Sequence, residues 1–202
     1  MNTHTRFRAN AAAVDDPARR RWSVAEIEQM VAAGIIAEHE RIELIDGEVV
    51  VMSPKGARHE MIKIALNRFF QRAAPDNLEI APETTLRLDQ HSFVEPDFCV
   101  FKRGIDLKSL DGPKVLLAIE VADSSLAYDT GRKIGIYAAY GVREVWVVNA
   151  NTLVTRVHRN PAKTSYRTKR DLAPARRLVP ASAADLAVCL TDLGLAPIAD
   201  AT

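Results

Sequence analysis

The spacing of apolar residues along the chain predicts three helices. Over residues 58–73 apolar side chains recur every three or four positions, which is the pattern of an amphipathic helix. Another helix is expected after Ser23, because Glu26 follows it at the spacing of a capping box. A third helix is expected over residues 128–140, with Asp129 as its N-cap.

Shorter apolar runs predict strands between these helices. Residues 114–122 are apolar except for one acid near the end, which is typical of a central strand covered on both faces. The pair Asp46-Gly47 lies between two apolar runs and is a strong signal of a tight hairpin turn. Further strands are expected over residues 41–45, 48–52, 78–81, 84–88, 93–101, 142–149, 153–158 and 166–168.

The order of the elements sets the expected fold class. Hairpins come first, and a strand, strand, helix, strand series follows, which predicts an α/β fold with a central mixed sheet flanked by helices. The 202 residues suit one domain, expected over residues 22–190. Residues 1–21 lack apolar periodicity and are expected to be a flexible tail, and residues 191–202 are expected to form a C-terminal tail.

Composition narrows the class of protein without naming a partner. No apolar run approaches the length of about 18 residues of a membrane span, and the N-terminal arginines precede no apolar segment of a secretory signal. Cys99 and Cys189 show no metal or redox spacing, so we expect thiols in a reducing compartment. A soluble, cytoplasmic protein is therefore expected. The net charge of +1 argues neither for nor against nucleic acid.

Two acids in neighbouring predicted strands are the first candidates for chemistry. Asp97 follows Pro96 at the start of one strand, and Glu120 lies near the end of the next. If these strands pair antiparallel, the two acids lie side by side. An acid in so apolar a strand is costly unless something compensates its charge. A shared Mg²⁺ or Mn²⁺ ion would do so, and it would leave positions open for water and a phosphate oxygen.

A lysine is the third group that phosphodiester hydrolysis favours at such a site. Side chains alternate along a strand, so a lysine two residues after Glu120 would share its face, but that position is Ala122. The nearest candidate is Lys133 on the predicted helix that follows. Its structural alternative is an ordinary helix-stabilising pair with Asp129, four residues before it.

The ordered set of motifs resembles the Uma2 family, formerly a domain of unknown function, within the PD-(D/E)XK nuclease superfamily. The resemblance covers roughly residues 22 to 190. Each motif alone is weak, but their order is specific. The matching segments are Ile45–Pro54, His59-Glu60, Val94–Asp97, Ile119–Ser125, Asp129–Lys133 with Tyr137, and Gly141–Val148.

The resemblance implies a restriction-endonuclease-like core, a divalent metal, usually Mg²⁺, and nucleic acid as substrate. It makes Asp97 and Glu120 similar to the two acids of the superfamily motif, and Lys133 similar to a lysine that has migrated from the strand to the helix. It also implies a group from the first core helix that completes the site, either His59 or Glu60, and Glu48 as a residue that lines the same cleft. Because such nucleases often pair to cut both strands, the resemblance also implies a homodimer.

Three functions stay open from the sequence. The first is a metal-dependent endonuclease, with DNA as the expected nucleic acid, in which water attacks phosphorus in line. The second is a nuclease fold without catalysis that binds nucleic acid or protein, which Ala122 motivates. The third is a metal-dependent hydrolase of a small phosphorylated substrate, which no phosphate-binding loop supports. The eight basic residues of Arg156–Arg177 could contact phosphates or form a solvated face.

Overall fold

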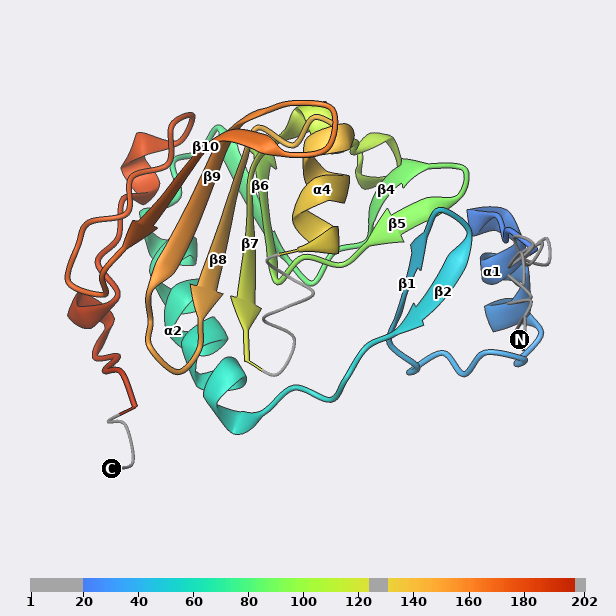
Figure 1. Ribbon diagram of the computed structural model, residues 1–202, viewed down its shortest axis with the longest axis horizontal. Coiled ribbons are helices and arrows are strands. Elements are labelled where there is room, and N and C mark those ends of the chain that lie inside the picture. Colours follow the sequence, from blue (N-terminus) through green and yellow to red (C-terminus); the bar gives the residue numbers. More distant parts are fainter. Residues whose placement is uncertain (1–19, 124–130, 199–202) are drawn as a thin grey trace, which may run out of the picture.

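The computed structural model describes residues 20–123 and 131–198. Their α-helices are α1 (Val24–Ala32), α2 (Ala57–Ala73) and α4 (Arg132–Ala139). Their strands are β1 (Ile42–Ile45), β2 (Glu48–Val51), β3 (Leu78–Pro82), β4 (Leu86–Asp89), β5 (Ser92–Val94), β6 (Phe98–Lys102), β7 (Val115–Ala122), β8 (Glu144–Asn149), β9 (Thr155–Pro161) and β10 (Tyr166–Leu172). Short 3₁₀ helices lie at Leu107–Ser109, Gly112–Lys114, Ala184–Leu186 and Thr191–Leu193. The strands form two sheets that lie next to each other (Figure 1).

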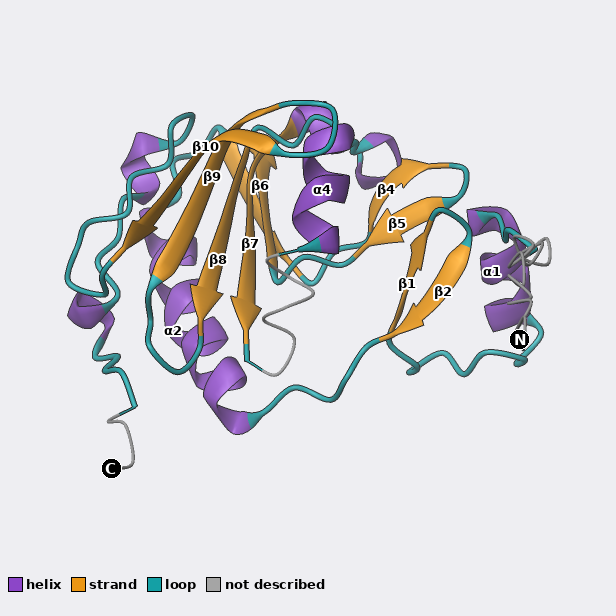
Figure 2. Ribbon diagram, viewed as in Figure 1, coloured by secondary structure: helices purple, strands orange, loops and turns teal. Residues whose placement is uncertain are grey.

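The larger sheet has six strands in the order β10-β9-β8-β7-β6-β3. Strands β7 and β8 are parallel and the other neighbours are antiparallel, so the sheet is mixed, as expected. One face packs on α2, where Ile62, Leu66 and Phe70 are buried against the sheet. The other face packs on α4 through Ile134 and Tyr137. Figure 2 shows the helices on the two sides of this sheet, which confirms the predicted α/β fold.

Strand β7 is buried along its whole length, because the sheet is covered on both faces. Leu117, Ile119 and Val121 belong to the core on the α2 side. Ala118 and Ala122 belong to the core on the α4 side. This alternation places position 120 on the α4 side of the sheet.

The smaller sheet has four strands in the order β2-β1-β5-β4, and α1 packs on it. The predicted hairpin turn is present: Asp46 and Gly47 both have positive φ, 52° and 81°, as a tight hairpin turn of the primed type requires. The predicted capping box is also confirmed, since the backbone N–H of Glu26 donates to the Ser23 hydroxyl and the N–H of Ser23 donates to the Glu26 carboxylate.

One prediction about the strands is wrong. Residues 93–101 do not form one strand but two, β5 in the small sheet and β6 in the large sheet, with Glu95-Pro96-Asp97 between them. Pro96 has no N–H to donate to a ladder, so pairing is interrupted there. The chain crosses from one sheet to the other at this point. Asp97 therefore lies at the junction of the two sheets.

Two further predictions concern the start of the third helix and the C-terminal tail. Helix α4 begins at Arg132, and the expected N-cap, Asp129, lies outside the described residues. The segment expected as a C-terminal tail contributes the buried side chain of Leu195 to the core beside α2.

None of the helices within the two described ranges has the length and apolar character needed to span a bilayer.

Candidate active site

A cleft of about 220 Å³ lies where the two sheets meet, next to the start of α2. It draws side chains from both sheets and both flanking helices, so it is assembled only when the whole fold is in place. Its charged and polar lining includes Arg41, Lys55, His59, Asp97, Glu120 and Lys133. Three of these residues, Asp97, Glu120 and Lys133, are the candidate catalytic residues identified from the sequence.

The pairing of β6 with β7 brings Asp97 to Glu120. The strands are antiparallel with Phe98 opposite Ile119, so the next position on each strand places the two acids across from each other. The backbone N–H of Val121 donates to Oδ2 of Asp97 at 2.8 Å, which fixes the aspartate at the end of β7. Both acids are 4% exposed. The arrangement expected for an antiparallel pair is therefore present.

Asp97 is held by two further partners from the α2 end of the cleft. Nε2 of His59 lies 3.0 Å from Oδ2, and Nζ of Lys55 lies 3.0 Å from Oδ1. Burial alone would raise the pKa of Asp97, but the hydrogen bond and charge of His59, the charge of Lys55 and the N–H of Val121 together lower this pKa to about 2. Asp97 is therefore a carboxylate at neutral pH.

Glu120 is held from the opposite side by α4. The ammonium of Lys133 lies 2.9 Å from Oε1 of Glu120 and 2.8 Å from Oε1 of Glu43. The hydroxyl of Tyr137, one turn further along the helix, also donates to Oε1 of Glu120. Burial, followed by the charges of Glu120 and Glu43, raises the pKa of Tyr137 well above its ordinary value, so the phenol stays a donor.

The ammonium next to Glu120 comes from α4 and not from position 122 of β7, which is an alanine. Ala122 and Glu120 lie on the same side of β7, the side that faces α4. Lys133 rises from that helix and is 1% exposed. A lysine on the helix thus supplies an ammonium to the acid that a lysine at position 122 would have neighboured.

Glu43 was missed by the sequence reasoning, although the signal was present. It lies in β1, where all four residues are buried, and its own exposure is 0%. An acid in a short apolar strand is costly unless its charge is compensated, so Glu43, like Glu120, indicates a nearby partner. Its Oε1 also accepts a hydrogen bond from the N–H of Glu95 at 3.0 Å. Glu43 therefore ties the small sheet to Lys133 and to the large sheet.

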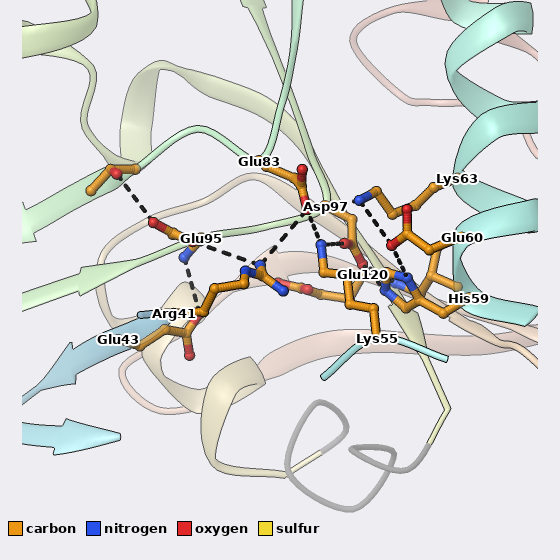
Figure 3. A network of polar contacts seen from close by, with 12 residues as sticks. Arg41, Glu43, Lys55, His59, Glu60, Lys63, Glu83, Glu95, Asp97 and Glu120 are labelled. Atoms are coloured by element: carbon orange, nitrogen blue, oxygen red, sulfur yellow. Dashed lines mark hydrogen bonds and ion pairs between the residues drawn. The ribbon is translucent and has the colours of Figure 1, made fainter. Parts of the chain in front are cut away.

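A second group of charges surrounds Asp97 on the side of α2. Lys55 contacts the carboxylate of Glu83 as well as that of Asp97, and Lys63 lies 2.7 Å from Glu83. Burial would raise the pKa of Glu83, but the hydrogen bonds from both lysines lower it to about 2. Arg41 completes the group at 3.8 Å from Glu83 and 3.7 Å from Glu95. Figure 3 shows these side chains converging on Asp97.

The other three predicted site residues lie at different distances from the acid pair. His59 contacts Asp97 directly. Glu60 is one step removed, with its carboxylate 3.2 Å from Nδ1 of His59. Glu48 is not among the residues that line the cleft; its carboxylate pairs with Arg132 at 3.2 Å. Of the three, only His59 touches one of the two acids.

The basic stretch lies apart from the cleft. It forms most of the β9–β10 hairpin, and β10 is an edge strand of the large sheet. Arg156 pairs with Asp171 across the hairpin at 2.7 Å and 2.8 Å. None of its residues lines the cleft.

The ion-pair network at the cleft contains more negative than positive groups. Its carboxylates are Glu43, Glu60, Glu83, Glu95, Asp97 and Glu120, and its cations are Arg41, Lys55, Lys63 and Lys133. Among the described residues the network thus holds six acids and four bases, with His59 not counted. Burial raises the pKa of Glu95, although Arg41 opposes the rise. The surplus of carboxylates favours the binding of a cation.

The donor set suits a cation that prefers oxygen and keeps part of its water. Asp97 and Glu120 are carboxylates on adjacent strands, and both line the same cleft. Within residues 20–123 and 131–198, no three His, Cys, Asp or Glu side chains are grouped as a metal site. Mg²⁺ fits two acids, since it usually binds one or two carboxylates and completes its shell with water and substrate phosphate.

Comparisons with known proteins agree with this fold. No curated protein matches the chain. A crystal structure of a "putative nuclease belonging to DUF820" from Anabaena variabilis superposes with a TM-score of 0.61 and 16% sequence identity, covering 85% of this chain and 96% of that one. At that identity the likeness concerns the fold alone. The Uma2 family model, described as "putative restriction endonuclease", matches residues 24–191, and the chain therefore belongs to the Uma2 family.

Proposed function

We propose that this protein is a metal-dependent endonuclease that hydrolyses phosphodiester bonds of nucleic acid, with DNA as the substrate. The observation that carries the proposal is the buried ammonium of Lys133, 2.9 Å from Glu120 at the strand end that also receives Asp97. Two acids on adjacent strands and a lysine are the groups that metal-assisted phosphodiester hydrolysis requires. The family to which the chain belongs and the fold of its structural neighbour support the same class of reaction.

Asp97 and Glu120 are the residues that would hold Mg²⁺ or Mn²⁺. Both are buried at one end of the cleft, and Asp97 is ionised at neutral pH because its pKa is about 2. When bound, the ion would supply positive charge at the scissile phosphate and an acidified water molecule. The protein's part is to fix the direction of both carboxylates, through Val121 and His59 for Asp97 and through Lys133 and Tyr137 for Glu120.

Lys133 is proposed to orient the attacking water and to stabilise the negative charge that develops on phosphorus-bound oxygen. The ammonium of Lys133 is held in place, because Glu43 and Glu120 contact it from two sides. Attack of water forms a new P–O bond and breaks the bond to the 3′ oxygen. The attacking water gives up one proton as it bonds to phosphorus, and the departing oxygen takes up one proton, so the products are a 5′-phosphate and a 3′-hydroxyl. Cutting both strands of a duplex would use two such clefts, which is why we propose a homodimer.

The second candidate function is a nuclease fold that binds without cutting. The observation in its favour is that protein groups already occupy both oxygens of Asp97: Lys55 holds Oδ1, and His59 and the Val121 N–H hold Oδ2. If these contacts are permanent, Asp97 cannot accept a metal ion. Titration of the protein with Mn²⁺ in a calorimeter separates the two functions, since only the nuclease binds the ion.

Nicking of supercoiled plasmid in Mg²⁺ or Mn²⁺ tests the proposed activity. Wild-type protein is expected to nick, and Asp97→Asn and Glu120→Gln are expected to lose at least about 100-fold in rate, the scale seen when one electrostatic contributor is removed. Asp76→Asn is the matched control, because Asp76 is a fully exposed acid whose nearest cation, Arg103, lies 3.9 Å away. Equal rates for Asp97→Asn and Asp76→Asn would show that the site is assigned wrongly.

A further inference from the structure

Lys55 stands in a place that neither the sequence motifs nor the proposed reaction explains. It belongs to residues 52–56, the irregular segment that joins β2 to α2. Its ammonium lies 3.0 Å from Oδ1 of Asp97 and also contacts the carboxylate of Glu83. A lysine therefore covers one oxygen of an acid that the proposed function assigns to a metal ion.

The two lysines of the cleft differ in how firmly they are held. Lys133 rises from a helix, its side chain is 1% exposed, and carboxylates that are themselves buried hold it from both sides. Lys55 rises from an irregular segment, and its side chain is 14% exposed. Its second partner, Glu83, is 44% exposed. Lys55 can therefore move at a much smaller cost of desolvated charge than Lys133 can.

Glu83 gives Lys55 a place to remain when it leaves Asp97. The two acids are neighbours, since the N–H of Glu83 donates to the backbone carbonyl of Asp97 at 3.2 Å. Lys55 contacts both carboxylates at once. A small shift of the ammonium toward Glu83 would uncover Oδ1 without leaving the lysine unpaired. Glu83 already accepts Lys63 as well, so its negative charge serves more than one cation.

Resting on the proposed function, we propose that Lys55 is a displaceable counter-ion of Asp97. It neutralises the carboxylate before the metal ion binds and gives up Oδ1 when the ion arrives. It then stays at the cleft beside Glu83, where its ammonium meets a phosphate oxygen of the incoming nucleic acid. Lys55 is thus a positioning residue for the metal ion and a binding residue for the substrate, whereas Lys133 keeps a fixed place.

The affinity for Mn²⁺, measured by calorimetry without nucleic acid, tests the first half of this proposal. Lys55→Met removes the competing charge while keeping an apolar stem of similar length. It is expected to tighten Mn²⁺ binding by about tenfold or more, because a cation within a few ångströms of a metal ligand opposes a second cation. Lys55→Arg keeps the charge and is expected to bind Mn²⁺ as the wild type does. A purely structural role for Lys55 would not tighten metal binding.

The matched control is Lys63→Met, which removes another cation of the same network. Lys63 pairs with Glu83 and Glu60, at 2.7 Å and 3.4 Å. The Lys63→Met variant is expected to tighten Mn²⁺ binding clearly less than the Lys55→Met variant does. Unchanged or weaker binding by a Lys55→Met protein with the circular dichroism spectrum of the wild type would overturn the proposal. The proposed function would survive that result if Asp97→Asn still abolished binding, whereas absence of binding by the wild type would end both.

The Michaelis constant for a DNA duplex of fixed length, at saturating Mn²⁺, tests the second half. Lys55→Met is expected to raise KM about tenfold, since one charged contact to a phosphate is lost. Metal affinity and substrate affinity would then change in opposite directions in a single variant. A KM equal to that of the wild type would refute the contact between Lys55 and phosphate.

Discussion

The ammonium of Lys133 lies 2.9 Å from Oε1 of Glu120, although one residue belongs to a helix and the other to the centre of a sheet. The contact exists because position 120 faces α4 and because Lys133 is buried beneath that helix, with 1% of its surface exposed. Glu43 approaches the same ammonium from the small sheet at 2.8 Å. Three separate parts of the fold therefore meet at one buried lysine, and this lysine should matter for stability as well as for activity.

Replacing Lys133 with methionine is expected to lower the free energy of unfolding by about 3–5 kcal/mol, because removal of one partner leaves buried charge uncompensated. Glu43 and Glu120, with exposures of 0% and 4%, would both lose the ammonium that now contacts them. Urea unfolding followed by circular dichroism measures the change. Lys102→Met is the control, since Lys102 is exposed on β6 and its loss should change stability by no more than about 0.5 kcal/mol. Similar values for the two variants would contradict the role given to Lys133.

Removing the charge of Glu43 while keeping its shape should act on catalysis through Lys133. Glu43→Gln retains an oxygen that can accept the N–H of Glu95, the bond that now measures 3.0 Å. It loses the charge that holds the ammonium, so we expect kcat for DNA to fall about tenfold with KM within about twofold of the wild type. Glu79→Gln, on an exposed acid paired with Arg103, is the control. A rise in KM without a fall in kcat would mean that Glu43 acts on substrate binding instead.

The acid sensitivity of the fold should include a contribution from Asp97. Its pKa is lowered from 3.8 to about 2, so the folded state favours the carboxylate. The stabilisation is fully present above pH 3.8 and is lost as pH falls through about 2. Because Asp97 is buried, the shift corresponds to roughly 2 kcal/mol.

The comparison of wild type with Asp97→Asn isolates that contribution from the other acids. Unfolding free energies are measured in urea at several pH values between 5 and 2. The difference between the two proteins should shrink by roughly 2 kcal/mol toward the lower pH, since asparagine cannot titrate. A difference that stays constant over this range would show that the pKa of Asp97 is not lowered by folding.

Local signals in the sequence predicted local structure well. The Asp46-Gly47 turn depends on two adjacent residues, and the capping box of Ser23 and Glu26 lies within one turn of helix, so each could be predicted without the rest of the fold. The division of residues 93–101 between two sheets could not be predicted in this way. Pro96 indicated an interruption, but which sheet received each half depended on long-range pairing.

The sequence predicted those residues of the candidate site that differ clearly from their neighbours along the chain. Glu120 stands out because it interrupts an apolar strand, and Asp97 because it lies between two apolar segments. Lys55 and Glu83 lie in irregular segments, and Lys55 is 28 residues from Glu83 and 42 residues from Asp97, so nothing nearby indicated their role. A contact between segments that distant depends on packing of the whole domain and has no signature at either residue.

The exchange of a lysine between helix and strand gives the sharpest test of the site. Lys133→Ala should lose about 100-fold or more in nicking rate, because the ammonium next to Glu120 is gone. Ala122 is 1% exposed and shares the side of β7 on which Glu120 lies. Adding Ala122→Lys to Lys133→Ala should restore at least about tenfold of the lost rate, since the new ammonium would rise from the strand toward the same carboxylate. The double variant must first show cooperative urea unfolding, which excludes a loss of activity through misfolding.

Ala118→Lys with Lys133→Ala is the control, because position 118 lies on the same side of β7 but two residues before Glu120, away from the strand end that receives Asp97. Rescue at position 122 and none at position 118 would show that the ammonium at Glu120, rather than the helix that now carries it, is what the reaction requires. A folded double variant at position 122 with no gain in rate would refute the role of Lys133 in the reaction.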